Sequence, residues 1–181
     1  PHLDHPTLAK VKAAFPDARL RATEFAGDTT LVVEPEQLHA VLRFLHDDPQ
    51  CEYDFLSDVT AVDYLGYPAE QPGRFAVVYI LRSTSRNLRI TVKTYLDPSV
   101  DTSGAELDPA LEVDSATDIW PGGEWREREV YDMFGIRFRN HPDLRRILSW
   151  EGFPAFPLRK DYPLRGRGER EHYRVTHRND T

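Results

Sequence analysis

Apolar and polar positions follow a helical rhythm in two stretches of the N-terminal half of this chain. Four apolar residues after Pro35 recur at i, i+3, i+4 and i+7, which places them on one face of an amphipathic helix. They are Leu38, Val41, Leu42 and Leu45. Three apolar residues before Pro16 keep a helical spacing, and the proline ends that segment. They are Leu8, Val11 and Phe15. The sequence therefore predicts one short and one longer helix.

Five other stretches alternate apolar and polar residues or are rich in β-branched residues, and they predict strands. They span residues 19–25, 29–33, 55–64, 75–81 and 88–96. The first two form a hairpin that turns at Gly27, and the last two form a second hairpin across Ser83–Asn87. The last strand carries Arg89 and Lys93 on the face opposite its apolar residues, so we expect that face to meet water or a partner.

The order of these elements is helix, two strands, helix, three strands (α-β-β-α-β-β-β). This order predicts an α+β fold of two layers, in which helices pack on one face of a mixed, mostly antiparallel five-stranded sheet. A turn-rich linker follows over residues 97–113. Gly122 and Gly123 then precede a further helix that runs through Phe134, and Gly135 is placed to end it.

The character of the chain changes after Pro142, where prolines and glycines exclude a long helix or a central strand. We therefore divide the chain into an α+β domain, residues 1–140, and an extended Pro/Gly/Arg-rich docking arm, residues 141–181. Ordering about 20 residues costs roughly 20–40 kcal/mol, which needs on the order of 1,000 Å² of apolar contact. From Arg145 onward we expect the arm to be disordered or to lie across a partner, and its aromatic residues favour the partner.

Charge and cysteine content restrict the kinds of partner and of bound group that this chain can have. The net charge is −7, yet residues 145–181 hold nine basic and five acidic residues, so the arm is basic and the body acidic. The arm lacks the aromatic interleaving of a nucleic-acid site, which favours a protein partner. The single cysteine, Cys51, excludes an internal disulfide and a four-cysteine iron–sulfur site. The longest apolar run, residues 75–81, is too short to span a membrane, and the N-terminus lacks a secretory pattern, so we expect a cytoplasmic location.

The helix that ends at Phe134 is dense in charge and is the first candidate for chemistry. Glu124–Arg128 and Arg128–Asp132 are i, i+4 pairs of opposite charge, and such pairing lowers a carboxyl pKa and disfavours a general acid. His141 and Asp143 form half of a metal site without a second ligand cluster. Residues 166–168 form a lone G-x-G that no strand precedes, so no phosphate-binding turn is expected. The residues alone predict no active site.

Several segments nevertheless resemble one family closely. The pattern around the charged helix is similar to the signature of the C subunit of NADH:quinone oxidoreductase, respiratory complex I. It comprises Glu127-Arg128-Glu129, Asp132-Met133-Phe134, His141 and Arg145-x-Ile147-Leu148. Residues 157–164, PLRKDYPL, resemble the second hallmark of that family. Residues 58–64 and 74–79 are similar to its sheet region.

The resemblance implies a non-catalytic scaffold of the peripheral arm, with no catalytic, cofactor or metal site of its own. FMN, the iron–sulfur clusters and the quinone would be held by partner subunits. The expected partners are the D subunit, which helps to form the quinone pocket, and the subunits with the terminal clusters, but not nucleic acid. The whole complex would pass electrons from NADH to quinone and pump protons. The chain would then lie on the cytoplasmic face of the bacterial cell membrane and associate with it only through the complex.

The matched positions define the candidate signature and docking residues. They are Glu127, Arg128, Glu129, Asp132, His141, Arg145, Arg159, Lys160 and Asp161. One alternative is the equivalent component of a ferredoxin-dependent photosynthetic complex or a membrane-bound hydrogenase, whose motifs would look much the same. A more distant alternative is a free-standing acid/base enzyme that uses Glu129, Asp132 and His141.

Overall fold

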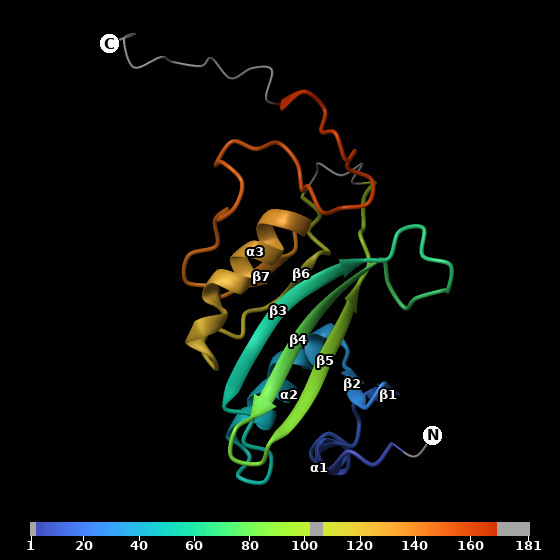
Figure 1. Ribbon diagram of the computed structural model, residues 1–181, viewed down its shortest axis with the longest axis vertical. Coiled ribbons are helices and arrows are strands. Elements are labelled where there is room, and N and C mark those ends of the chain that lie inside the picture. The colour runs from blue at the N-terminus through green and yellow to red at the C-terminus, as the bar shows by residue number, and fades with distance from the viewer. Residues whose placement is uncertain (1–2, 102–106, 170–181) are drawn as a thin grey trace.

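A five-stranded mixed sheet is the centre of the computed structural model, which describes residues 3–101 and 107–169 (Figure 1). The strands lie in the order β1-β2-β5-β4-β3. They are β1 Arg21–Phe25, β2 Asp28–Val32, β3 Phe55–Asp63, β4 Phe75–Ser83 and β5 Leu88–Leu96. Strands β2 and β5 pair in parallel, and the other three pairings are antiparallel. The predicted α+β fold with a mixed, mostly antiparallel sheet is confirmed.

Three α-helices in the described ranges accompany the sheet: α1 Pro6–Ala14, α2 Pro35–Asp47 and α3 Glu124–Phe134. The predicted stripe of α2 is fully buried and joins one apolar cluster with the alternate residues of β4 and β5. In Figure 1, α2 lies behind the sheet and α3 lies beside the edge strand β3. None of the helices described is long and apolar enough to cross a membrane.

A second, two-stranded sheet was not predicted. Strand β6 (Glu112–Asp114) pairs in parallel with β7 (Arg137–Arg139), so the predicted linker over residues 97–113 is wrong at its C-terminal end. Each strand has only three residues, too few to show a period in the sequence. The short 3-10 helix η1, Pro121–Gly123, leads from this region into α3.

Helix α3 ends where the sequence predicts, at a glycine in the left-handed conformation. Gly135 has φ 73°, which side chains other than glycine rarely adopt. A Cβ atom there would lie 2.5 Å from Nη2 of Arg159 and 2.8 Å from the ring of Phe156. The glycine is therefore required both by the turn and by the segment that packs against it.

The segment that packs against Gly135 corrects the expectation that the arm is either disordered or laid across a partner. The chain after β7 (orange in Figure 1) runs along the outside of α3 and returns to the end of the sheet. Ala155, Phe156 and Arg159 are buried, so this part of the arm is ordered by contacts within the chain. Residues 170–181 lie outside the described ranges, and the division at residue 140 stays a prediction.

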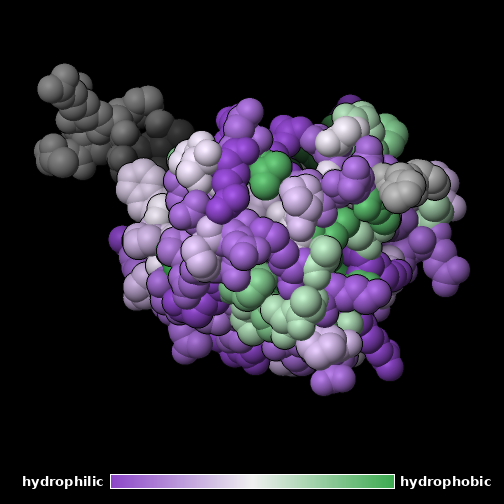
Figure 2. All heavy atoms as spheres, turned by 90° about the horizontal axis from the view of Figure 1, so that it is seen from below, coloured by the Kyte–Doolittle hydropathy of each residue, from purple (hydrophilic) through white to green (hydrophobic). Residues whose placement is uncertain are grey.

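The surface seen from below is mostly hydrophilic, with apolar residues in small groups (Figure 2). Large exposed apolar side chains occur at isolated positions such as Phe25 and Phe55. Others gather over α3 and the arm, which is the region described next.

Candidate docking site

The candidate site is built around α3, and its first element is a buried acid. Glu127 is fully buried and accepts hydrogen bonds from Oγ of Ser115 at 2.6 Å and from the backbone N–H of Ala116 at 2.8 Å. Burial raises the pKa of Glu127 to about 7, although the two hydrogen bonds oppose that rise. This carboxyl fastens α3 to the loop after β6, out of reach of a substrate.

Asp132 is also fully buried, and it anchors the beginning of the arm. Its carboxylate pairs with Nη1 of Arg146 at 2.7 Å. It also accepts three backbone N–H bonds, from Ile147 at 3.0 Å and from Leu148 and Ser149 at 2.7 Å each. Burial alone would raise the pKa of Asp132, but the N–H of Ser149, Arg146 and the other two N–H groups outweigh it and lower the pKa.

Arg128 corrects the predicted charge pairing along α3. Its Nε donates to the carbonyl of Arg145 at 3.1 Å, and its Nη2 donates to the carbonyl of Arg146 at 3.0 Å. The predicted ion pairs Glu124–Arg128 and Arg128–Asp132 are therefore wrong. The i, i+4 rule applies to exposed helix faces, whereas Arg128 is buried beneath the arm, where backbone carbonyls need donors.

Of the other charged residues of the first signature, Glu129 and Arg145 are exposed and His141 is half-buried. Nδ1 of His141 accepts the N–H of Asp143 at 3.1 Å, so its Nε2–H donates to the carbonyl of Glu124 at 3.0 Å. Arg145 is exposed and pairs with Asp143, and Glu129 is exposed on the outer face of α3. His141 thus contacts the first turn of α3 and Asp132 lies in its last turn, roughly 12 Å along the helix axis. No acid/base cluster of Glu129, Asp132 and His141 is formed.

In the second hallmark, Arg159 is a buried cation between aromatic rings. Its Nε donates to the carbonyl of Phe134 at 2.6 Å. Its guanidinium lies 4.5 Å from the ring centroid of Phe156 and 5.6 Å from that of Phe75. Burial lowers the pKa of Arg159 to about 10. The side chain thereby ties the arm both to the end of α3 and to β4.

Lys160 and Asp161 fasten the arm to the end of β3. The backbone N–H of Lys160 donates to Asp63 at 2.8 Å, while its side chain is exposed. Arg74 lies between two acids, 3.0 Å from Asp63 and 2.8 Å from Asp161. Burial opposes the charge of Asp63, but Arg74 and two backbone N–H groups outweigh it and lower its pKa. The sequence did not single out Asp63 or Arg74, because their partners are up to 97 residues away.

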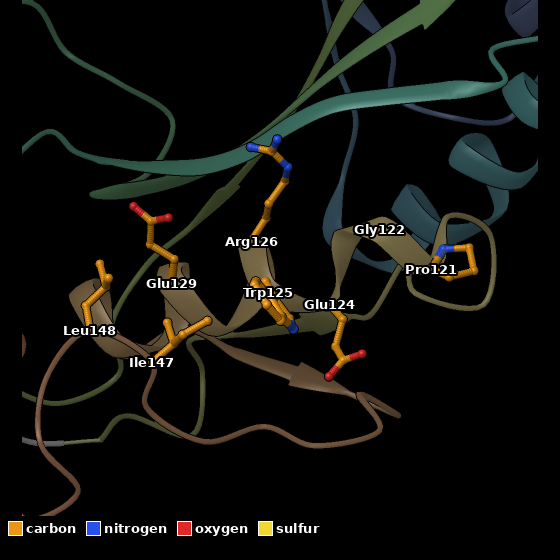
Figure 3. A pocket seen from close by; sticks show the side chains of 8 residues that line it. All are labelled: Pro121, Gly122, Glu124, Trp125, Arg126, Glu129, Ile147 and Leu148. Atoms are coloured by element: carbon orange, nitrogen blue, oxygen red, sulfur yellow. The ribbon is translucent and has the colours of Figure 1, made fainter.

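A groove of about 550 Å³ runs along the outer face of α3. It is lined by Pro121, Gly122, Glu124, Trp125, Arg126, Glu129, Ile147 and Leu148. Figure 3 shows Trp125 on the open side of the helix, with Arg126 turned toward β3 and Glu124 turned the other way. Trp125 was not predicted as a site residue, although a tryptophan among the charges of this helix was a usable signal.

Within residues 3–101 and 107–169, no group of three or more His, Cys, Asp or Glu side chains could hold a metal ion. The region around α3 therefore combines an arm that hydrogen bonds and ion pairs hold against the domain with an exposed apolar groove. An exposed apolar groove of this kind is typical of a surface that binds another protein.

A family model, the 30 Kd subunit of respiratory-chain NADH dehydrogenase, matches residues 31–168. The chain belongs to this family. The NADH-quinone oxidoreductase C subunit of Citrifermentans bemidjiense is 47% identical over 92% of this chain and 93% of its own length. That of Roseiflexus castenholzii is also 47% identical, over 90% of this chain and 86% of its own length. The resemblance to the signature is thus confirmed at the level of the family.

Two solved structures share the fold. A trypsin-resistant fragment of Nqo5 superposes with a TM-score of 0.60 at 29% identity, over 76% of this chain and 96% of the fragment. A chain of the archaeal membrane-bound sulfane sulfur reductase superposes with a TM-score of 0.67 at 20% identity, over 97% of this chain and 96% of its own. The second likeness concerns the fold alone. Members of the family are subunits of an oxidoreductase complex, so the partners of this chain are other subunits of such a complex.

Proposed function

We propose that this chain is a non-catalytic scaffold in the peripheral arm of a proton-translocating NADH:quinone oxidoreductase. The observation that carries the proposal is how the buried signature side chains are used. Glu127, Arg128, Asp132 and Arg159 are buried, and their hydrogen bonds hold α3, the arm and the sheet to one another. Groups used in this way shape a surface, and they do not reach a substrate.

The proposed partner is the D subunit, which helps to form the quinone pocket, together with the subunits that hold the terminal clusters. FMN, the iron–sulfur clusters and the quinone would then all be bound by partners. Attachment would be peripheral, on the cytoplasmic face of the bacterial membrane and through the complex alone. The exposed groove beside Trp125 and the ordered arm supply the surface that such packing needs.

The relatives favour NADH as the electron donor of the parent complex. The relatives at 47% identity are named as NADH-quinone oxidoreductase subunits, whereas the sulfane sulfur reductase is only 20% identical. A ferredoxin-dependent complex or a hydrogenase would keep the same signature, so the identity of the copurifying polypeptides decides between them.

The test is affinity purification of the tagged chain from the native membranes of its organism. We expect an NADH-oxidising flavoprotein to copurify in a 1:1 ratio with the chain, and the isolated chain to bind no flavin and to oxidise no NADH. A stoichiometric flavin on the isolated chain, or NADH oxidation by it, would refute the scaffold role. A ferredoxin-docking or hydrogenase polypeptide in place of the flavoprotein would refute the assignment to complex I.

A further inference from the structure

The groove on α3 does not end at the helix but continues onto the arm. A second hollow of about 610 Å³ lies between residues 148 and 169, and Leu148 lines both hollows. Trp125 at one end is 68% exposed, Leu148 at the junction is 64% exposed, and Leu164 at the far end is fully exposed. These three side chains mark one continuous surface, which we call the apolar strip.

Three large apolar side chains are exposed along the apolar strip, and between them they line two adjoining hollows. Large exposed apolar side chains that together line adjoining hollows are typical of a surface that binds another molecule. A tryptophan at such a position is the residue type that most often dominates binding energy at protein interfaces. Trp125 therefore has the properties of an anchor, and its removal leaves the core behind it intact.

Charge is distributed unevenly along the apolar strip. At the α3 end the groove is flanked by the carboxylates of Glu124 and Glu129. The third charged residue that lines the groove, Arg126, is turned toward β3, where Asp58 pairs with it and offsets its charge (Figure 3). The α3 end of the strip is consequently acidic.

The arm end of the strip has the opposite sign. Arg165 lines the second hollow, and Arg167 lies beside it with its guanidinium 5.6 Å from the ring centroid of Tyr162. The acid in this hollow, Glu169, accepts the Tyr162 hydroxyl at 2.8 Å and the backbone N–H of Arg167 at 2.7 Å. Among the residues that the structure describes, this end thus carries two arginines and one acid, a formal charge of +1.

We propose that the apolar strip binds one continuous segment of a partner protein of defined polarity. The segment has apolar side chains along its middle, Lys or Arg where it meets Glu124 and Glu129, and Asp or Glu where it meets residues 164–169. A protein segment fits better than a lipid surface, because the acidic end repels anionic headgroups. The inference rests on the proposed function, since it describes the surface that would lie against a neighbouring polypeptide in the complex.

The test uses membranes from a strain that lacks this chain, to which the purified full-length chain is added back. Trp125→Ala is expected to weaken rebinding ~30-fold or more, as loss of a central aromatic anchor does. Glu129→Lys is expected to weaken it roughly tenfold, and the loss should grow at low ionic strength because the charges then act over a longer range.

The β1 strand offers matched controls on another part of the molecule. Phe25 is 86% exposed and Glu24 is exposed beside it, so Phe25→Ala and Glu24→Lys make the same chemical changes outside the strip. Both controls are expected to rebind like the unchanged chain. Circular dichroism and thermal unfolding of each variant confirm that the fold is kept.

Photo-crosslinking within the rebound complex reads the polarity directly. With p-benzoylphenylalanine placed at position 125 or at position 164, we expect both positions to crosslink to the same polypeptide, near a basic peptide at 125 and an acidic one at 164. Crosslinks to two polypeptides, to lipid only, or with the charges reversed would overturn the inference.

If the unchanged chain rebinds but Trp125→Ala and Glu129→Lys rebind equally well, the inference fails and the proposed function stands. If the unchanged chain does not rebind to NADH-oxidising membranes, both fail.

Discussion

Removal of the Arg146 side chain should release the arm from α3 and destabilise the fold. Arg146 donates to the Asp132 carboxylate and carbonyl at 2.7 and 3.0 Å, and to the carbonyls of Phe153 and Ala155 at 2.8 and 2.9 Å. Its guanidinium also lies 5.0 Å from the ring centroid of Phe156. The guanidinium is thus the central donor of the arm.

The magnitude follows from these contacts. Three bonds to neutral carbonyls contribute about 1 kcal/mol each, and the bond between the two ionised groups contributes about 2 kcal/mol. Their sum, about 5 kcal/mol, agrees with the ~3–5 kcal/mol measured when one member of a buried ion pair is removed. We therefore expect Arg146→Ala to lower the free energy of unfolding by ~3–5 kcal/mol.

The assay is urea denaturation combined with limited proteolysis of residues 145–165. The neighbouring residue supplies the control, because the Arg145 side chain is 71% exposed and that of Arg146 only 13%. Arg145→Ala loses one exposed pair with Asp143 and should cost less than ~1 kcal/mol. Equal losses for the two alanine variants, or an arm in Arg146→Ala as protease-resistant as the unchanged one, would refute this reasoning.

Three further predictions test other parts of the structure. The pKa of Glu127 rises to about 7 on folding, so the protonated carboxyl stabilises the fold fully below its unfolded pKa near 4.5, and this stabilisation is lost as the pH rises through about 7. Between about pH 5 and about pH 8 the free energy of unfolding should therefore fall by ~2–3 kcal/mol more in the unchanged chain than in Glu127→Gln. Parallel pH profiles of the two proteins would contradict this. Gly135→Ala should lower the free energy of unfolding, measured by urea denaturation, by at least ~2 kcal/mol, because φ is positive there and the added Cβ would lie 2.5 Å from Nη2 of Arg159. In Gly122→Ala the added Cβ meets open space, so the free energy of unfolding should change by less than ~0.5 kcal/mol. Equal effects of the two substitutions would show that Gly135 is not constrained. Arg74→Ala removes the cation between Asp63 and Asp161 and should lower the free energy of unfolding by ~3 kcal/mol. Arg126→Ala removes a more exposed ion pair and should lower it by less than ~1 kcal/mol. Equal losses in the two variants would contradict a stabilising role of Arg74 between the two acids.

The elements that the sequence predicted well are those whose signal is local. The stripe of α2 extends from Leu38 to Leu45 and the alternation of β5 covers its 9 residues, and both elements lie where predicted. The end of α3 was also predicted, because a glycine in the left-handed conformation is a local requirement. The three-residue strands β6 and β7 have no such repeat and were missed.

The site itself was only partly predictable, because its contacts join distant residues. The sequence indicated that Asp132 is paired, but assigned it to Arg128, four residues earlier, when the partner is Arg146. Asp63 receives the N–H of Lys160, and the Trp125 groove is completed by Leu148 from the arm. Such pairings depend on how the arm folds back, which no local pattern encodes.

The central claim is that the signature builds a surface and carries no chemistry, and turnover per assembled complex tests it most directly. Glu129→Gln, Asp132→Asn and His141→Ala change the three residues that an acid/base enzyme would use. NADH:quinone turnover should be measured in purified membranes and divided by the amount of assembled complex, taken from its FMN content. We predict that the variants lower the amount of complex in proportion to the stability or docking affinity that each one loses, and leave turnover per complex within about twofold of the unchanged enzyme. Normal amounts of complex with turnover lost by a factor of about 100 or more would contradict the account, because that is the loss expected when a general acid or base is removed.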